Sequence, residues 1–172
     1  MSRTVRILVF VLVTSALPTT TLFTTSVFAA PPKALPSMTF AGSDGHPLRT
    51  EDLEGKVVLL DFWASWCIPC RKSFPEVDQL SKDFVSKGLT VVAVSVDEQR
   101  KNADAFLTLF PHSMTVAFDP AGAAAATLDL QGMPSSLLID RSGHIRFTHM
   151  GYRKKTVEQF RAEIVQLLAE AK

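Results

Sequence analysis

The chain contains two cysteines, Cys67 and Cys70, with two residues between them. The residues before them, 57–63, are almost all apolar, and a polar, amphipathic stretch follows Cys70. This pattern predicts a buried strand that delivers the two thiols to the start of a helix. A thiolate at a helix N-terminus is reactive because free backbone N–H groups and the positive end of the helix dipole lower its pKa. A structural disulfide is the alternative, but closing so short a loop stabilises a fold by only about 2 kcal/mol on the entropic model. We therefore predict a redox pair.

The composition indicates one globular domain with a short extension. The chain has 172 residues, of which 47% are apolar, enough for a sizeable core without a framework of disulfides. Its 18 basic and 17 acidic residues nearly balance, and the basic run Arg153–Lys155 suits a solvated helix start. Nucleic acid is therefore not an expected partner.

The segment 1–30 has the pattern of a secretory signal peptide. Arg3 and Arg6 precede an apolar core at 7–17, and small residues at 29–30 would permit cleavage. The core is shorter than the roughly 20 residues that span a bilayer; an uncleaved membrane anchor that includes the Thr-rich segment after it is the alternative. We expect a protein of the periplasm or cell envelope. An oxidising compartment closes thiol pairs, so a reductant there needs electrons from outside.

Beyond a Pro-rich linker at 31–36, one domain is expected at 37–172. Turn residues and hydrophobic periodicity predict the elements that position the cysteines. In chain order these are hairpin strands at 38–40 and 47–49, a short turn at 50–53, a strand at 56–62, a helix at 67–86, a strand at 89–96, a helix at 100–110, a strand at 115–118, a helix at 121–128, hairpin strands at 135–139 and 144–150, and a helix at 156–169. This order of strands and helices indicates an α/β fold with a central mixed sheet flanked by helices.

Several segments together resemble one protein family. The stretch 55–70 is similar to the active-site strand and helix start of thioredoxins, and 132–143 resembles their cis-proline loop and the hairpin after it. Two further features resemble the exported TlpA/ResA-like branch. They are an N-terminal hairpin that ends in Leu-x-Gly-Lys at 53–56, and an extra helix and strand at 100–118. The resemblance implies a thioredoxin fold with an N-terminal β-hairpin and a central helix/strand insert. It also implies thiol–disulfide oxidoreductase activity, without a cofactor or a bound metal.

The same resemblance implies a role for each residue of the redox centre. Cys67 would be the exposed nucleophile that attacks a client disulfide, and Cys70 would resolve the mixed disulfide and leave a Cys67–Cys70 disulfide. Asp61 matches the buried acidic residue of thioredoxins; there it would accept the proton of Cys70, its own pKa raised by desolvation. The alternative for Asp61 is a strand-end residue that points to solvent. Glu98 resembles the acidic residue that the ResA-like insert places near the cysteines, although a solvated charge at the start of the next helix would also explain it.

Client binding is expected around the cysteines and the cis-proline loop. Pro134 would be the cis-proline, and the Met133 backbone before it would pair with an extended substrate. Trp66 would be a contact surface, whereas Trp63 would pack inside. Pro69 lies where strongly oxidising relatives carry a histidine that stabilises the reduced thiolate, so we predict a reductant.

The resemblance also suggests partners. These are disulfide-containing client proteins, such as apocytochrome c or copper-centre assembly proteins, with a membrane thiol reductase as electron donor. We expect a monomer.

Other functions are compatible with the two thiols. One is a copper carrier that uses Cys67 and Cys70; a zinc site that adds His144 and His149 is disfavoured, because the two histidines lie at odd spacing on one strand and so point to opposite faces. The other is a thiol peroxidase of the related peroxiredoxin branch, but the proline of the Pro-x-x-x-Thr/Ser-x-x-Cys context is missing before Cys67. A non-catalytic interaction domain is disfavoured by the intact cysteine pair.

Overall fold

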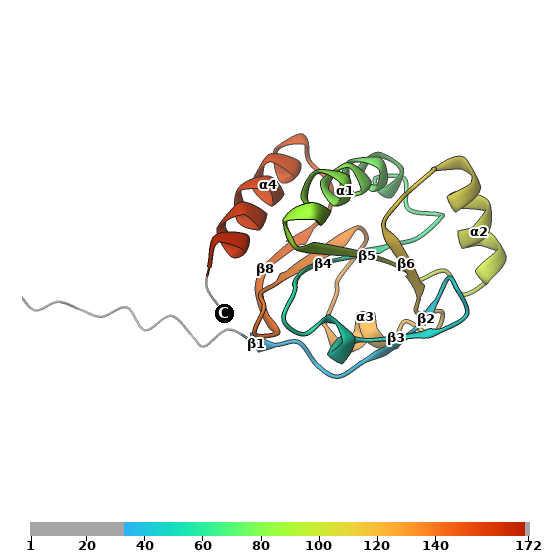
Figure 1. The fold of residues 1–172 in the computed structure, drawn as a ribbon. Helices are drawn as coiled ribbons and strands as arrows, with labels where there is room; N and C mark the ends of the chain where they lie inside the picture. The colour runs from blue at the N-terminus through green and yellow to red at the C-terminus, as the bar shows by residue number, and fades with distance from the viewer. Residues whose placement is uncertain (1–32, 171–172) are drawn as a thin grey trace, which may run out of the picture. The chain divides into compact units, whose positions relative to one another are not determined.

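The computed structural model describes residues 33–170, and Figure 1 shows their fold. The strands are β1 (Lys33–Ala34), β2 (Thr39–Gly42), β3 (Pro47–Arg49), β4 (Val57–Trp63), β5 (Leu89–Ser95), β6 (Thr115–Phe118), β7 (Ser135–Ile139) and β8 (His144–Met150). The helices are α1 (Cys70–Phe84), α2 (Arg100–Leu109), α3 (Ala123–Thr127) and α4 (Lys154–Ala169), with the short 3-10 helices η1 (Thr50–Leu53) and η2 (Val85–Lys87). The predicted signal peptide at 1–30 lies outside the described residues.

The strands form one mixed sheet of eight, in the order β1-β8-β7-β4-β5-β6-β2-β3. At its centre, β4 is parallel to β5 and antiparallel to β7. All seven residues of β4 are buried, as are most of those of β5. Strands covered on both faces are typically apolar throughout, which explains the nearly continuous apolar runs in the sequence.

Helices cover both faces of the sheet, so the core has two layers. On the first face, α1, α2 and α4 pack against Leu59 and Trp63, and this cluster includes both cysteines. On the second face, η1, α3 and the β2–β3 hairpin pack against Leu60 and Phe62. Figure 1 shows α1 and α4 above the sheet, α2 at its right-hand side and α3 below it. The α/β fold with a mixed sheet, an N-terminal hairpin and a central insert is therefore confirmed.

Two local predictions differ from the structure. The helix predicted at 67–86 begins at Cys70, because the first α-helical hydrogen bond runs from Ser73 N to Pro69 O, and the turn before it is tighter. In the predicted linker at 31–36, Lys33 and Ala34 form β1, paired with β8. A two-residue edge strand depends on its partner and leaves no periodicity in its own sequence.

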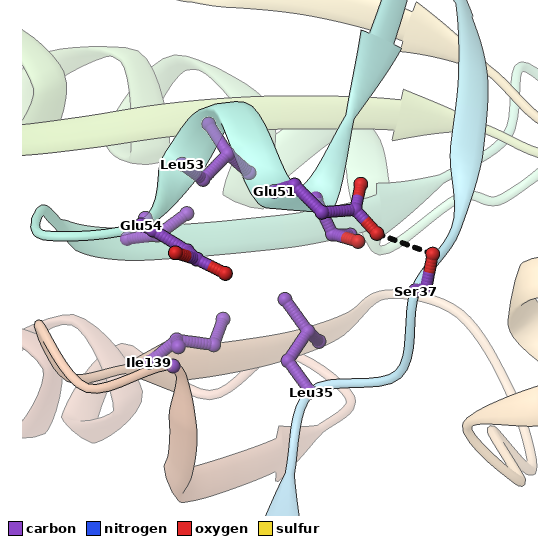
Figure 2. A pocket seen from close by; sticks show the side chains of 9 residues that line it. Leu35, Ser37, Glu51, Leu53, Glu54 and Ile139 are labelled. Atoms are coloured by element: carbon purple, nitrogen blue, oxygen red, sulfur yellow. Dashed lines mark hydrogen bonds between the residues drawn. The ribbon is translucent and has the colours of Figure 1, made fainter.

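Figure 2 shows a pocket of about 230 Å³ between the N-terminal segment and η1. Leu35, Leu53 and Ile139 line it, and Ser37 donates a hydrogen bond to Glu51 at its edge. Leu53 and Ile139 belong to the second face of the sheet, whereas the cysteines belong to the first. The pocket is therefore separate from the redox pair. Within residues 33–170, no helix combines the length and apolar character needed to cross a membrane.

Candidate active site

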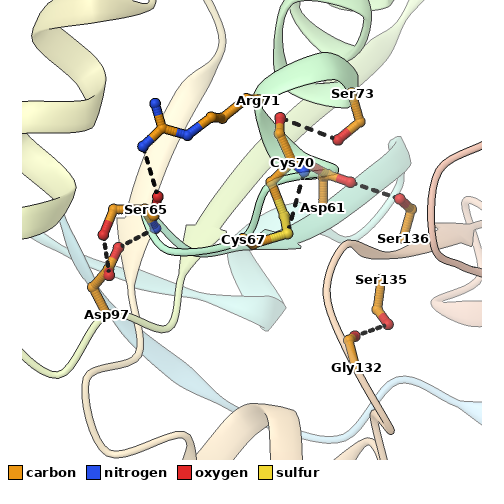
Figure 3. The surroundings of a disulfide bond; sticks show 10 residues. All are labelled: Asp61, Ser65, Cys67, Cys70, Arg71, Ser73, Asp97, Gly132, Ser135 and Ser136. Atoms are coloured by element: carbon orange, nitrogen blue, oxygen red, sulfur yellow. Dashed lines mark hydrogen bonds between the residues drawn. A yellow bond between two sulfur atoms is a disulfide. The ribbon is translucent and has the colours of Figure 1, made fainter.

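Cys67 and Cys70 are joined by a disulfide at the start of α1 (Figure 3). The S–S distance is 2.01 Å, and the two Cα atoms are 5.3 Å apart. The backbone N–H of Cys70, the first residue of α1, donates a hydrogen bond to Cys67 Sγ at 3.2 Å. The start of the helix is thus directed at the Cys67 sulfur. After reduction, the same N–H and the helix dipole would stabilise a thiolate on Cys67.

The exposure predicted for Cys67 is wrong. Only 3% of the surface of Cys67 is exposed to solvent, and Cys70 is fully buried. The chain turns inward before the helix, where the Cys67 N–H bonds to Ala64 O at 3.1 Å. The neighbours Trp66 and Ile68 instead project into solvent, with 67% and 74% of their surface exposed. The residues on either side of the buried Cys67 in the sequence are therefore exposed and apolar.

Asp61 lies in the middle of β4 and is completely buried. Because side chains alternate along a strand, Asp61 shares its face with Leu59 and Trp63, which belong to the same cluster as both cysteines. Burial raises its pKa to about 7, against the opposing effect of the hydrogen bond from Ser136. The solvent-pointing alternative is therefore excluded. A carboxyl group that titrates near neutral pH is suited to accept and release a proton.

Ser136 is a partner of Asp61 that sequence reasoning missed. It pairs with Asp61 in the β4–β7 ladder, and its hydroxyl donates to Asp61 Oδ1 at 2.6 Å (Figure 3). The second carboxyl oxygen, Oδ2, is buried without a hydrogen-bond partner in the described structure. Ser136 carries no signal of its own in the sequence, because its role follows from the register between two strands.

Asp97 is a second residue that sequence reasoning missed. Its side chain accepts hydrogen bonds from Ser65 N at 2.9 Å and Ser65 Oγ at 2.7 Å. Asp97 follows β5, and Ser65 follows the parallel neighbour β4. The carboxyl ends of parallel strands meet at one edge of a sheet, which is the signal that could have brought the two together.

Glu98 is exposed and lies beside Trp66. Both residues, with Asp97, line a recess of about 300 Å³, and neither cysteine contributes to its lining. Among the residues that follow β5, Asp97 therefore holds the loop that leads to the cysteines, whereas Glu98 borders the surface next to it.

The cis-proline loop has the geometry that the resemblance implies. The Met133–Pro134 peptide bond is cis, and Pro134 O accepts a hydrogen bond from Gly151 N at 2.8 Å. Pro134 is buried, whereas Met133 is partly buried and packs against both core clusters. Ser135, which follows, donates to Gly132 O at 2.6 Å and lies in the surroundings of the disulfide (Figure 3). Pro69 is exposed at the N-terminal cap of α1, and Trp63 is fully buried, as expected.

The histidines considered as metal ligands contact carboxylates of the domain instead. His149 Nε2 lies 2.7 Å from Glu163, and His144 Nδ1 lies 3.7 Å from Asp140. Across the described part of the chain, no three His, Cys, Asp or Glu side chains are grouped so that they could hold a metal ion.

A mixed sheet, a Cys-x-x-Cys pair at the start of α1 and a cis-proline loop define a thioredoxin-fold protein. The Redoxin family model matches residues 30–164, and the chain belongs to this family. Together with this match, individual relatives confirm the resemblance to the TlpA/ResA-like branch.

The chain is 33% identical over 128 residues to the thioredoxin-like protein YneN of Bacillus subtilis, covering 72% of this chain and 74% of YneN. It is 30% identical over 113 residues to the thiol-disulfide oxidoreductase ResA of Bacillus cereus, covering 66% of this chain but only 65% of ResA. The crystal structure of a candidate thiol:disulfide interchange protein DsbE from Chlorobium tepidum superposes with a TM-score of 0.77 at 40% identity, covering 80% of this chain and 97% of that one.

Proposed function

We propose that this protein is a thiol–disulfide oxidoreductase that reduces disulfides of client proteins in the cell envelope. The observation that carries the proposal is the Cys67–Cys70 pair, with the Cys70 N–H directed at the Cys67 sulfur. The buried carboxyl group of Asp61 on the same face of the sheet supports it, as do relatives named for this activity.

The reaction proceeds by two exchanges of sulfur partners. The Cys67 thiolate attacks one sulfur of the client disulfide, so that a mixed disulfide forms and the client's other sulfur leaves as a thiolate, which takes up a proton. Asp61 then accepts the proton of Cys70, and the Cys70 thiolate attacks Cys67 Sγ. The Cys67–Cys70 disulfide forms, and the client's second sulfur leaves as a thiolate that takes up a proton, so the client departs with two thiols. Two electrons have passed to the client, and a membrane thiol reductase returns the pair to its reduced form.

Client binding in this proposal uses the surface around the disulfide. The exposed Trp66 supplies an apolar contact on one side of Cys67. The Met133 backbone before Pro134 pairs with an extended client segment, and Pro69 borders the approach to the cysteines. Glu98 adds a negative charge to the recess beside Trp66. The protein acts as a monomer.

The direction of the reaction follows from Pro69, which provides neither charge nor a donor to stabilise the reduced thiolate. Export through the segment 1–30 places the reaction in the envelope, where apocytochrome c and copper-centre assembly proteins are candidate clients.

The proposal is tested by the reduction potential and by trapping. Equilibration of the purified protein with glutathione buffers should give a potential nearer the thioredoxin value of about −270 mV than the value of about −120 mV of a strong oxidant. In cells, Cys70→Ser should accumulate mixed disulfides through Cys67, and the double variant Cys67→Ser/Cys70→Ser should not. A strongly oxidising potential would refute the reductant, and the absence of trapped species would refute the catalytic role.

A further inference from the structure

The loop between β4 and α1 is held by a buried carboxylate from outside that loop. Asp97 is only 4% exposed. Its Oδ2 accepts a hydrogen bond from Ser65 N at 2.9 Å, and its Oδ1 accepts one from Ser65 Oγ at 2.7 Å (Figure 3). Oδ2 also accepts a hydrogen bond from Ser95 Oγ at 3.0 Å. Hydrogen bonds to an ionised acceptor are roughly twice as strong as neutral ones. The Asp97 side chain therefore fixes both the backbone and the side chain of Ser65.

Ser65 is also held from its other side. Arg71 in the first turn of α1 donates from Nη2 to Ser65 O at 3.4 Å, so the N–H, the hydroxyl and the carbonyl of Ser65 are all engaged. The next two residues are Trp66 and Cys67. Trp66 lines two recesses, of about 270 and 300 Å³. The position of Ser65 therefore sets the direction in which the chain presents both Trp66 and the Cys67 sulfur.

We propose that Asp97 is a positioning residue for disulfide exchange, and that it acts through Ser65. The inference rests on the proposed function, because it concerns the rate at which Cys67 attacks a client disulfide. Attack requires the thiolate to be in line with the S–S bond of the client, and small displacements of a reacting group lower rates steeply. Asp97 preorganises the Cys67 loop and thereby removes the need to order it during attack.

The chain contains a matched pair of residues away from the cysteines. Asp78 Oδ1 accepts from Ser113 N at 2.6 Å and from Ser113 Oγ at 3.0 Å, so this carboxylate also binds both the N–H and the hydroxyl of one serine, although through a single oxygen. This second pair joins α1 to the segment before β6 rather than to the cysteine loop. A purely structural role predicts equal consequences at the two serines, whereas a positioning role predicts a loss of rate at Ser65 alone.

The experiment compares Ser65→Ala with Ser113→Ala in the otherwise unchanged protein. Stopped-flow mixing of the reduced protein with a protein disulfide measures the rate constant of attack, and thermal unfolding measures stability. Both variants should lower the melting temperature by a similar amount. Ser65→Ala should also lower the rate constant about tenfold, or about 1.4 kcal/mol of barrier, and Ser113→Ala should not. Ser65→Thr keeps the hydroxyl and should recover the rate.

Two further measurements separate positioning from other effects. Trp63 is fully buried, so acrylamide quenching of fluorescence reports mainly on Trp66 and should change in Ser65→Ala but not in Ser113→Ala. Asp97→Asn should slow attack as well, and the double variant with Ser65→Ala should lose no more than the larger single effect, because the two residues act through one contact.

Three results would overturn the inference. The rate constant of attack could be the same in Ser65→Ala as in the wild type, or Ser113→Ala could lower it as much as Ser65→Ala does. The third is that the losses of Ser65→Ala and Asp97→Asn add up in the double variant. Failure of the proposed function is distinguishable, because the wild type itself would then fail to reduce disulfides. The quenching of Trp66 fluorescence requires no activity, so it tests whether the Asp97–Ser65 contact holds the loop in either case.

Discussion

Replacing Asp61 by Asn should stabilise the protein at alkaline pH and remove part of its pH dependence. The carboxyl group has a pKa of 3.8 when unperturbed, and desolvation by burial, partly offset by the Ser136 hydrogen bond, raises the pKa to about 7. Between these two values the folded state holds a proton that the unfolded state has released. The contribution of Asp61 to stability is therefore greatest below about pH 4 and falls by about 1.4 kcal/mol per pH unit until about pH 7. The full difference is about 4 kcal/mol.

Asn mimics the neutral acid closely at this site. Its amide oxygen can still accept from Ser136 Oγ, and its NH₂ group takes the place of Oδ2, which has no partner in the described structure. We expect Asp61→Asn and the wild type to unfold at similar urea concentrations near pH 4.5. At pH 8.5 the variant should be more stable by up to about 4 kcal/mol, measured by urea unfolding of the oxidised protein.

Asp78→Asn provides a control of opposite sign. Desolvation raises the pKa of Asp78, but hydrogen bonds from Lys82, Ser113 and Met114 outweigh it, and the net result is a lowered pKa. This carboxylate therefore stabilises the fold above its unfolded pKa, and the contribution is lost as the pH falls through the lower folded value. Asp78→Asn should destabilise the protein most at high pH. If Asp61→Asn instead keeps the wild-type slope between pH 4 and pH 7, the carboxyl group titrates normally and the reasoning is wrong.

Three other substitutions test separate contacts. Arg141 donates to three carbonyl oxygens at the C-terminal end of α4, so Arg141→Ala should lower the free energy of unfolding by about 2 kcal/mol; an unchanged urea midpoint would contradict this. The hydrogen bond from the Tyr152 hydroxyl to Glu76 Oε1, 2.8 Å long, raises the pKa of Tyr152, the single tyrosine of the chain. Glu76→Gln should therefore lower the midpoint of phenolate absorbance against pH, and an unshifted midpoint would rule out this cause. Glu98→Gln should speed client reduction by up to about twofold at low salt only, because a negative charge in the recess beside Trp66 disfavours the Cys67 thiolate and salt screens it; equal rates at low salt would place Glu98 outside the reaction.

Local patterns predicted the secondary structure well, but they could not predict which residues meet. The strands at 115–118, 135–139 and 144–150 were located within their observed bounds, because turn residues flank them. Burial of Cys67 was missed because it depends on the inward turn to Ala64 and on packing within the first core cluster, neither of which is periodic. The edge strand β1 was missed for the same reason, since pairing with β8 creates it.

The choice between Asp97 and Glu98 shows how strand geometry supplements a family resemblance. Val91 and Ala93 of β5 face the core cluster that contains the cysteines, whereas Val92 and Val94 face the opposite cluster. Continued with a period of two beyond the end of β5, this alternation places position 97 on the cysteine side and position 98 on the other. The buried carboxylate that binds Ser65 lies at 97, and the exposed one at 98. A resemblance that depends on residue type alone cannot distinguish two adjacent acidic residues. The alternation of side chains along the strand before them can, and it assigns the contact with the cysteine loop to Asp97.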